Sequence, residues 1–124
     1  MTQEPYILHI EDERPLLQLI RHTLKLLGYN VMSVSSGEEG LAMIYQQKPA
    51  LVLLDLMMPG LDGRGVYRRM KADKNLADIP VIVITALMSD NREGIIVDGL
   101  PPVDDYITKP FEVERLIKAV RRFM

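Results

Sequence analysis

The chain has 124 residues, a formal net charge of −2, no cysteine, and 48% hydrophobic residues. Its length suits a single domain over residues 1–124, and the lack of cysteine excludes disulfides, thiolate catalysis and Cys-ligated zinc. Acidic and basic residues are mixed, which gives no support for a basic nucleic-acid-binding face. The N-terminal segment has no signal-peptide pattern, and every apolar run is too short to span a membrane. We therefore expect a cytoplasmic domain that binds neither nucleic acid directly nor membrane.

Short apolar runs alternate with amphipathic stretches, a pattern typical of a parallel α/β sheet. In chain order, the predicted elements are a strand at Tyr6–Ile10, a helix at about Pro15–Leu27, a strand at Asn30–Val34, a helix opening at Ser36, a strand at Leu51–Asp55, a helix at about Gly65–Ala72, a strand at Val81–Thr85, a helix at roughly Asp90–Val97, a strand at Asp105–Thr108 and a helix at about Val113–Phe123. This order predicts a doubly wound open sheet with helices on both faces.

Local signals support several of these boundaries. Pro15 suits the first turn of the first helix, and Gly28 suits the position just after its end. Ser36 and Glu39 have the spacing of a capping box at the start of the second helix. Gly94 interrupts the fourth predicted helix and weakens its pattern.

Polar side chains follow four of the five predicted strands. Glu11 and Asp12 follow the first strand, Asp55 and Thr85 end the third and fourth, and Lys109 follows the fifth. In a parallel sheet these groups converge at the carboxyl edge, where ligands of such sheets bind. Three neighbouring carboxylates repel one another, and they either raise the pKa of one of them or recruit a cation. Mg²⁺ fits best, with Asp12 and Asp55 as direct ligands and Glu11 acting through water.

Each of these residues also has an ordinary interpretation when it is taken alone. An aspartate at a strand end, such as Asp55, caps the following turn about as often as it forms a functional site. Glu11 and Asp12 are typical solvated acids of a loop. Thr85 is a common strand residue, and Lys109 a common surface residue. Neither His9 nor His22 takes part in this convergence, and both are interpreted as structural or exposed. The convergence of complementary groups at four strand ends is what favours a functional site.

Four segments of the chain resemble response-regulator receiver domains. They are I-L-H-I-E-D-E (Ile7–Glu13), L-V-L-L-D-L-M-M-P-G-L-D-G (Leu51–Gly63), I-P-V-I-V-I-T-A (Ile79–Ala86) and D-D-Y-I-T-K-P-F (Asp104–Phe111). The resemblance covers essentially the whole chain, with the motifs in the family's order and spacing. It implies a flavodoxin-like fold with five parallel strands in the order 2-1-3-4-5 and five helices.

The resemblance also implies a function. Asp55 looks like the phosphoacceptor, which takes a phosphoryl group from a phosphohistidine of a sensor histidine kinase or a phosphotransfer protein, or from acetyl phosphate. Mg²⁺ would be held by Glu11, Asp12, Asp55 and the backbone carbonyl of Met57, and Lys109 would pair with phosphoryl oxygens. Such a domain catalyses its own phosphorylation and dephosphorylation and is not a turnover enzyme on a separate substrate.

The family's switch carries over to two residues. Thr85 would reach the new phosphoryl oxygens, and Tyr106 would turn inward. The ordinary alternative for Tyr106 is an aromatic side chain packing on an edge strand. The movement would change the partner surface of the fourth helix, the fifth strand and the last helix, through which a homodimer is possible. The Lys109–Pro110 peptide bond is expected to be cis.

The chain departs from the family's pattern at two places. The first acid after the first strand is Glu11 where aspartate is usual, and two prolines lengthen and stiffen the Asp98–Val103 loop. Met57 and Leu87 occupy the positions that flank the phosphoryl group in this family. Because apolar side chains hinder an attacking water, we predict slow self-dephosphorylation.

Three other hypotheses of function compete with that of a phosphorylated receiver. A haloacid-dehalogenase-type phosphohydrolase needs an acid two residues after its aspartate, where this chain has Met57. A flavodoxin-like cofactor binder needs a phosphate-cradling loop after the first strand, where the acidic sequence Glu11–Arg14 would repel phosphate. A pseudo-receiver would serve only as an interaction module, although this chain keeps all the key residues.

Overall fold

The computed structural model describes residues 4–86 and 102–124. Its elements are β1 (Ile7–Ile10), α1 (Arg14–Leu26), β2 (Val31–Val34), α2 (Gly37–Gln46), β3 (Leu51–Leu54), α3 (Gly63–Ala72), β4 (Val81–Thr85), β5 (Asp105–Thr108) and α4 (Val113–Phe123). All five predicted strands and four of the five predicted helices are confirmed. The fourth predicted helix, at Asp90–Val97, lies outside the described residues. No helix in the described ranges is long and apolar enough to cross a membrane.

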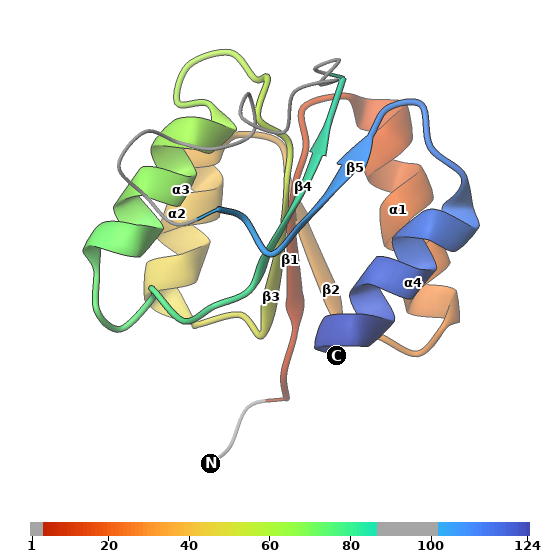
Figure 1. Cartoon of the computed structure of the whole chain (residues 1–124), viewed down its shortest axis with the longest axis horizontal. Coiled ribbons are helices and arrows are strands. Elements are labelled where there is room, and N and C mark those ends of the chain that lie inside the picture. Colours follow the sequence, from red (N-terminus) through yellow and green to blue (C-terminus); the bar gives the residue numbers. More distant parts are fainter. Residues whose placement is uncertain (1–3, 87–101) are drawn as a thin grey trace.

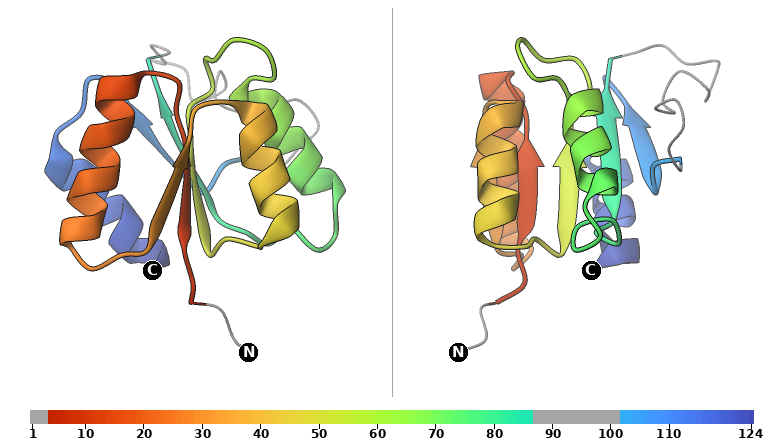
Figure 2. Two further views of the ribbon diagram at one scale, coloured as in Figure 1. Left: turned by 180° about the vertical axis from the view of Figure 1, so that it is seen from behind. Right: turned by 90° about the vertical axis from the view of Figure 1, so that its left-hand side faces the viewer.

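The five strands form one parallel sheet in the order β2-β1-β3-β4-β5, which confirms the flavodoxin-like arrangement. Helices α1 and α4 cover one face of the sheet, and α2 and α3 cover the other (Figures 1 and 2). The connection from β1 leads to β2 on one side of β1, whereas β3, β4 and β5 are added on its other side. The direction in which strands are added therefore reverses between β1 and β3. In such sheets, a ligand crevice forms beyond the carboxyl ends of the strands at this point.

Each face of the sheet has its own apolar core. The alternation of side chains along each strand sends successive residues to opposite faces. The core under α2 and α3 contains Leu8, Ile10, Val52, Leu54, Val66, Tyr67, Met70, Val81 and Val83, and the core under α1 and α4 contains Ile7, Ile20, Leu24, Leu51, Leu53, Ile82, Ile84, Leu116 and Val120. Strands β1, β3 and β4 are buried throughout, so both of their faces are apolar except at His9 on β1 and Thr85 on β4.

Helix α1 ends as its sequence predicts, on a glycine in the left-handed conformation. Gly28 has a φ of 91°, its amide donates to Lys25 O (3.0 Å), and the Tyr29 amide donates to Leu24 O (3.1 Å). These two bonds form a Schellman motif, which a residue with a Cβ adopts only with strain. The predicted cap of α2 is also present, since Ser36 Oγ accepts from the Glu39 amide at 3.1 Å.

Helix α3 begins two residues earlier than predicted, at Gly63. The reason is a cap that the glycine-rich sequence concealed: an Asp62 carboxylate oxygen accepts from the Gly65 amide at 3.1 Å. Gly63 also lies against the backbone of the β3–α3 loop. A Cβ at this residue would lie 2.3 Å from the carbonyl oxygen of Asp55 and 2.7 Å from Cα of Leu56. Gly63 therefore allows the helix to approach the residue that ends the third predicted strand.

We expect Gly63→Ala to lower the free energy of unfolding by about 2–3 kcal/mol, because the new methyl group meets backbone that cannot rotate aside. Gly65→Ala, in the same helix, is the matched control. Its Cβ would meet chiefly the Cδ1 tip of Leu61, at 2.4 Å, which can rotate away, and alanine favours the helix. Urea unfolding of both variants measures the difference. Equal stabilities would contradict the assigned role of Gly63.

Candidate functional site

The backbone pairing of the central strands continues one residue past their ends and fixes two carboxylates. The Glu11 amide donates to Val34 O at 3.0 Å, and the Asp55 amide donates to Ile10 O at 3.1 Å. Glu11 and Asp55 thus follow the neighbouring strands β1 and β3 side by side. Both are buried, with exposed fractions of 0% and 3%.

The predicted convergence of acids is confirmed. One carboxylate oxygen each from Glu11, Asp12 and Asp55 lies within 4.8 Å of the others. Asp12 is exposed, so the cluster reaches from the interior to the surface. Asp55 Oδ1 accepts a hydrogen bond from the Met57 amide at 3.0 Å, which fixes the carboxylate plane. The side chain of Met57 is 54% exposed.

Lys109 supplies the positive charge of the site. Its amide donates to Thr85 O at 2.8 Å, and its ammonium lies 3.1 Å from Glu11 and 3.2 Å from Asp55. The ammonium also lies 3.6 Å from the exposed carboxylate of Glu13, a contact that the sequence did not predict. Burial by itself would lower the pKa of Lys109, but hydrogen bonding and attraction to Glu11, together with Asp55, outweigh burial and raise it.

The single positive charge of Lys109 does not neutralise the negative charges of the three clustered carboxylates. Burial, reinforced by repulsion from Asp55, raises the pKa of Glu11 to about 7, although Lys109 acts in the opposite direction. Oε1 of Glu11 is buried and lies 3.1 Å from the Lys109 ammonium, which it shares with Asp55 and which makes no well-aligned hydrogen bond to it. Three clustered carboxylates with a single ammonium beside them offer the oxygen ligands that a hard divalent cation fits. The residues present therefore suit the predicted Mg²⁺.

The residues of the expected switch lie on β4 and β5. Thr85 ends β4 and is fully buried, while Tyr106 on β5 is half-buried against the core under α2 and α3. The Lys109–Pro110 peptide bond is cis, as predicted. Leu87, the second apolar residue expected beside the phosphoryl group, lies outside the described residues.

One buried histidine lies close to the site. Both ring nitrogens of His9 are buried and have no hydrogen-bond partner among the described residues. Burial, with the charge of Lys109, lowers the pKa of His9 to about 3. His9 is therefore neutral at physiological pH and belongs to the interior, in agreement with its structural interpretation.

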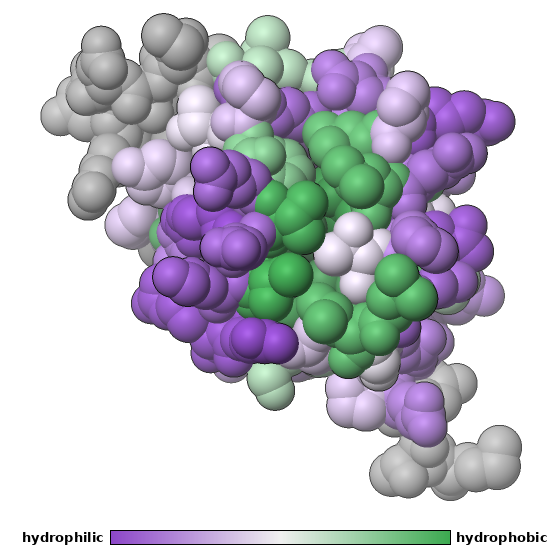
Figure 3. Space-filling view, turned by 90° about the vertical axis from the view of Figure 1, so that its right-hand side faces the viewer, coloured by the Kyte–Doolittle hydropathy of each residue, from purple (hydrophilic) through white to green (hydrophobic). Residues whose placement is uncertain are grey.

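An apolar groove adjoins the acidic cluster. It has a volume of about 710 Å³ and is lined by Glu13, Pro15, Leu16, Leu19, Ala86, Lys109, Pro110 and Phe111. On the side of the molecule where α1 and α4 lie, Figure 3 shows a strip of hydrophobic surface flanked by hydrophilic side chains. Because Lys109 lines the groove and lies 3.1 Å from Glu11 and 3.2 Å from Asp55, the groove adjoins the acidic cluster.

The fold and the site together define a class: flavodoxin-like domains with an acidic, cation-accepting site at the carboxyl edge of the sheet. Comparison with known proteins gives the family. The model of the response regulator receiver domain matches residues 7–121. The chain belongs to this family, the receiver domains of two-component signalling, as the resemblance indicated.

Three similar proteins illustrate the relationship. The DNA-binding dual master transcriptional regulator RpaA of Synechocystis sp. is 39% identical over 97% of this chain and 49% of its own length. The receiver domain of sensor histidine kinase PA1611 from Pseudomonas aeruginosa, with magnesium in its active site cleft, has a TM-score of 0.85, 27% identity and 98% coverage of both chains. Response regulator TrrA of Thermotoga maritima, in complex with Mg²⁺ and BeF, has a TM-score of 0.82, 26% identity, and coverages of 98% and 100%. The chain spans about half the length of the curated relatives it matches.

Proposed function

We propose that the chain is a phosphorylation switch that accepts a phosphoryl group on Asp55. The observation that carries the proposal is the pairing of this buried carboxylate with Lys109 at 3.2 Å, inside a cluster of further acids. A carboxylate acts as a nucleophile when it is positioned and its charge is retained. The Met57 amide orients one of its oxygens, and the ammonium holds the other.

The transfer is a displacement at phosphorus. An oxygen of Asp55 forms a bond to the phosphoryl group as the bond from phosphorus to the donor's imidazole nitrogen breaks, and the imidazole leaves with the electron pair. Lys109 neutralises charge that develops on the phosphoryl oxygens. The product is an acyl phosphate. We propose that Thr85 and Tyr106 respond to it as the switch pair. Their movement would change the partner surface, through which a homodimer would form.

Mg²⁺ is part of the proposed site. Glu11, Asp12, Asp55 and the carbonyl of Met57 would hold it. When bound, it neutralises negative charge on the carboxylates and on the incoming phosphoryl group. The magnesium-containing receiver domain of PA1611 supports this part of the proposal.

We propose the groove beside the site as the place where the phosphohistidine-bearing partner docks. Its apolar walls lead directly to Lys109, so a histidine presented by the partner would lie at the acceptor. Leu19 is 48% exposed in this groove, and burying it against a partner would favour binding. We propose that the switch acts in the cytoplasm together with such a partner.

Leu19→Asp is therefore expected to slow phosphorylation by a phosphohistidine donor roughly tenfold or more, because a charge replaces an apolar contact. Phosphorylation by acetyl phosphate should keep its rate, since a small donor needs no groove. Arg21→Asp, an exposed change on the same helix away from the groove lining, serves as the control. Equal losses with both donors would contradict the docking role.

The acyl phosphate is expected to persist for minutes or longer in the purified protein. The apolar side chain of Met57 stands beside Asp55 and cannot orient an attacking water. Met57→Asn should shorten the lifetime, because its amide can hold such a water. The loss of phosphoryl group is followed by intact mass after removal of the donor. Decay within seconds in the unchanged protein would contradict the prediction.

The experiment that tests the proposed function is the intact mass of the protein after incubation with acetyl phosphate, with and without Mg²⁺. We expect the gain of one phosphoryl group, located on Asp55 by peptide mapping and absent without Mg²⁺. If no gain is seen, beryllofluoride is added as a mimic of the acyl phosphate. Mg²⁺-dependent binding of beryllofluoride would preserve the phosphoryl site, whereas its absence would favour the pseudo-receiver.

A further inference from the structure

The charge of the chain is unevenly distributed along the sequence. Residues 64–74, which are α3 from its second residue and the turn after it, carry five basic side chains and one acidic one, a net charge of +4. The whole chain has a net charge of −2, so the remainder carries −6. The basic residues are Arg64, Arg68, Arg69, Lys71 and Lys74, and the acidic one is Asp73. This segment has the highest net positive charge of the described helices, although α1 (three basic and no acidic residues) and α4 (four basic residues and one acidic) are basic as well.

The fold leaves three of these cations exposed. Arg68, Arg69 and Lys74 make no ion pair within the described ranges. Lys71 differs, since its ammonium donates to Ala77 O at 2.7 Å and lies 5.2 Å from the centre of a tyrosine ring. A basic residue in the last turn complements the helix dipole, but this effect does not account for all three exposed charges.

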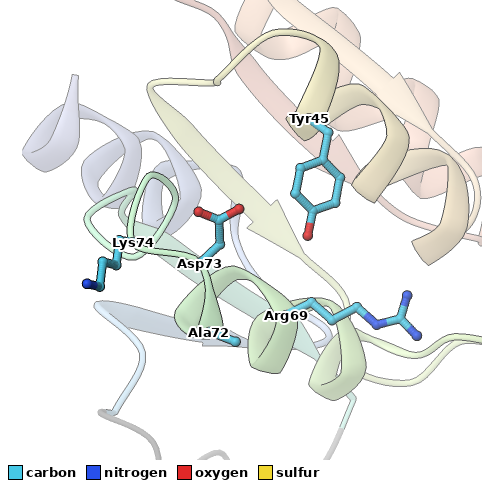
Figure 4. Close-up of a pocket in the computed structure, with 5 residues that line it drawn as sticks. All are labelled: Tyr45, Arg69, Ala72, Asp73 and Lys74. Atoms are coloured by element: carbon cyan, nitrogen blue, oxygen red, sulfur yellow. The ribbon is translucent and has the colours of Figure 1, made fainter.

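A groove lies beside these cations, between the C-terminal ends of α2 and α3. It has a volume of about 480 Å³ and is lined by Tyr45, Arg69, Ala72, Asp73 and Lys74. Figure 4 shows the ring of Tyr45 extending from α2 toward α3, with Arg69 and Asp73 on the opposite side of the groove. The tyrosine is 58% exposed. Tyrosine and arginine are the residue types that dominate binding energy at protein interfaces.

We propose that α3 and Tyr45 form a docking surface for an acidic segment of a protein partner. The exposed guanidinium and ammonium groups would pair with its carboxylates, and the tyrosine ring would contact the methylene groups of its acidic side chains. Nucleic acid fits less well. A duplex needs several phosphate contacts for firm binding, whereas only three cations of this segment lack an ion pair within the described residues.

This surface is separate from the proposed phosphodonor groove. Helices α2 and α3 cover one face of the sheet, and α1 lies on the other face (Figures 1 and 2). A partner on α3 therefore does not block a donor beside α1, and the two surfaces can be occupied together. The inference goes beyond the proposed function and does not depend on phosphorylation.

The test measures binding of fluorescein-labelled decaglutamate to the unphosphorylated chain by fluorescence anisotropy at low salt. Two double variants are compared: Arg68→Glu with Arg69→Glu, and Lys25→Glu with Arg121→Glu. Each changes the net charge by the same amount, and all four residues are exposed, so both variants are expected to fold. The second pair lies on α1 and α4 and controls for net charge alone. A DNA duplex with the same number of negative charges is the competing probe.

We expect the α3 double variant to bind decaglutamate roughly tenfold more weakly than the control variant does. Tyr45→Ser should also weaken binding, without any change of charge. Equal weakening by the two double variants would show a net-charge effect only and would overturn the proposal. No measurable binding to the unchanged protein, or tighter binding of the duplex than of decaglutamate, would overturn it as well.

Discussion

Asp55→Asn is expected to gain no phosphoryl group from acetyl phosphate and Mg²⁺, whereas the unchanged protein gains one. The substitution keeps the shape of the side chain and its hydrogen bond from the Met57 amide. It removes the negative charge and the nucleophilic oxygen that form the bond to phosphorus. Intact mass measures the result. Asp78→Asn, which alters an exposed aspartate away from the site, should be phosphorylated normally.

The same variant should be more stable than the unchanged protein when divalent ions are chelated. Glu11 and Asp55 repel each other in the interior, and one ammonium is shared between them. Removing one of the two charges leaves the other paired with Lys109, which stabilises the fold by about 1 kcal/mol. Urea unfolding in the presence of a chelator measures this change. A phosphorylated Asp55→Asn protein would contradict the assignment of the acceptor, and a destabilised one would contradict the repulsion.

Lys109→Ala is expected to destabilise the protein when divalent ions are chelated, whereas Asp55→Asn is expected to stabilise it. The lysine side chain is only 11% exposed and stands between two buried carboxylates. Removing one partner of a buried ion pair leaves uncompensated charge, which costs roughly 3 kcal/mol. The loss should appear in urea unfolding with a chelator present. Mg²⁺ should restore much of it, because a bound cation takes over the neutralisation of the carboxylates.

Mg²⁺ should bind the Lys109→Ala variant more tightly than it binds the unchanged protein, since the ammonium no longer competes for the carboxylates. Phosphorylation should nevertheless be slower, because the charge opposite the phosphoryl oxygens is gone. Lys118→Ala, an exposed change on α4, is the control and should change none of these properties. If Lys109→Ala were as stable in a chelator as this control, the ion pairs of the site would have no energetic role.

Much of the architecture follows from local patterns in the sequence. Alternating apolar runs predict the five strands, and the Schellman glycine Gly28 and the cap at Ser36 mark helix boundaries correctly. These signals are local because a strand, a helix turn or a cap depends on residues a few positions apart. The sequence places the start of α3 two residues too late, because the cap at Asp62 stands among glycines that conceal the start of the helical pattern.

By itself, the sequence also determined which residues gather at the carboxyl edge, since parallel strands bring their ends together whatever their exact packing. The resemblance to receiver domains added the order of the strands and the roles of Asp55 and Lys109. Only the tertiary structure decided the energetics of the site. Glu13 contacts Lys109 across most of the chain, and His9 is buried without a hydrogen-bond partner among the described residues. Gly63 approaches the Asp55 backbone because of how the loop between β3 and α3 folds back. Burial and charge act through space, and no local pattern records them.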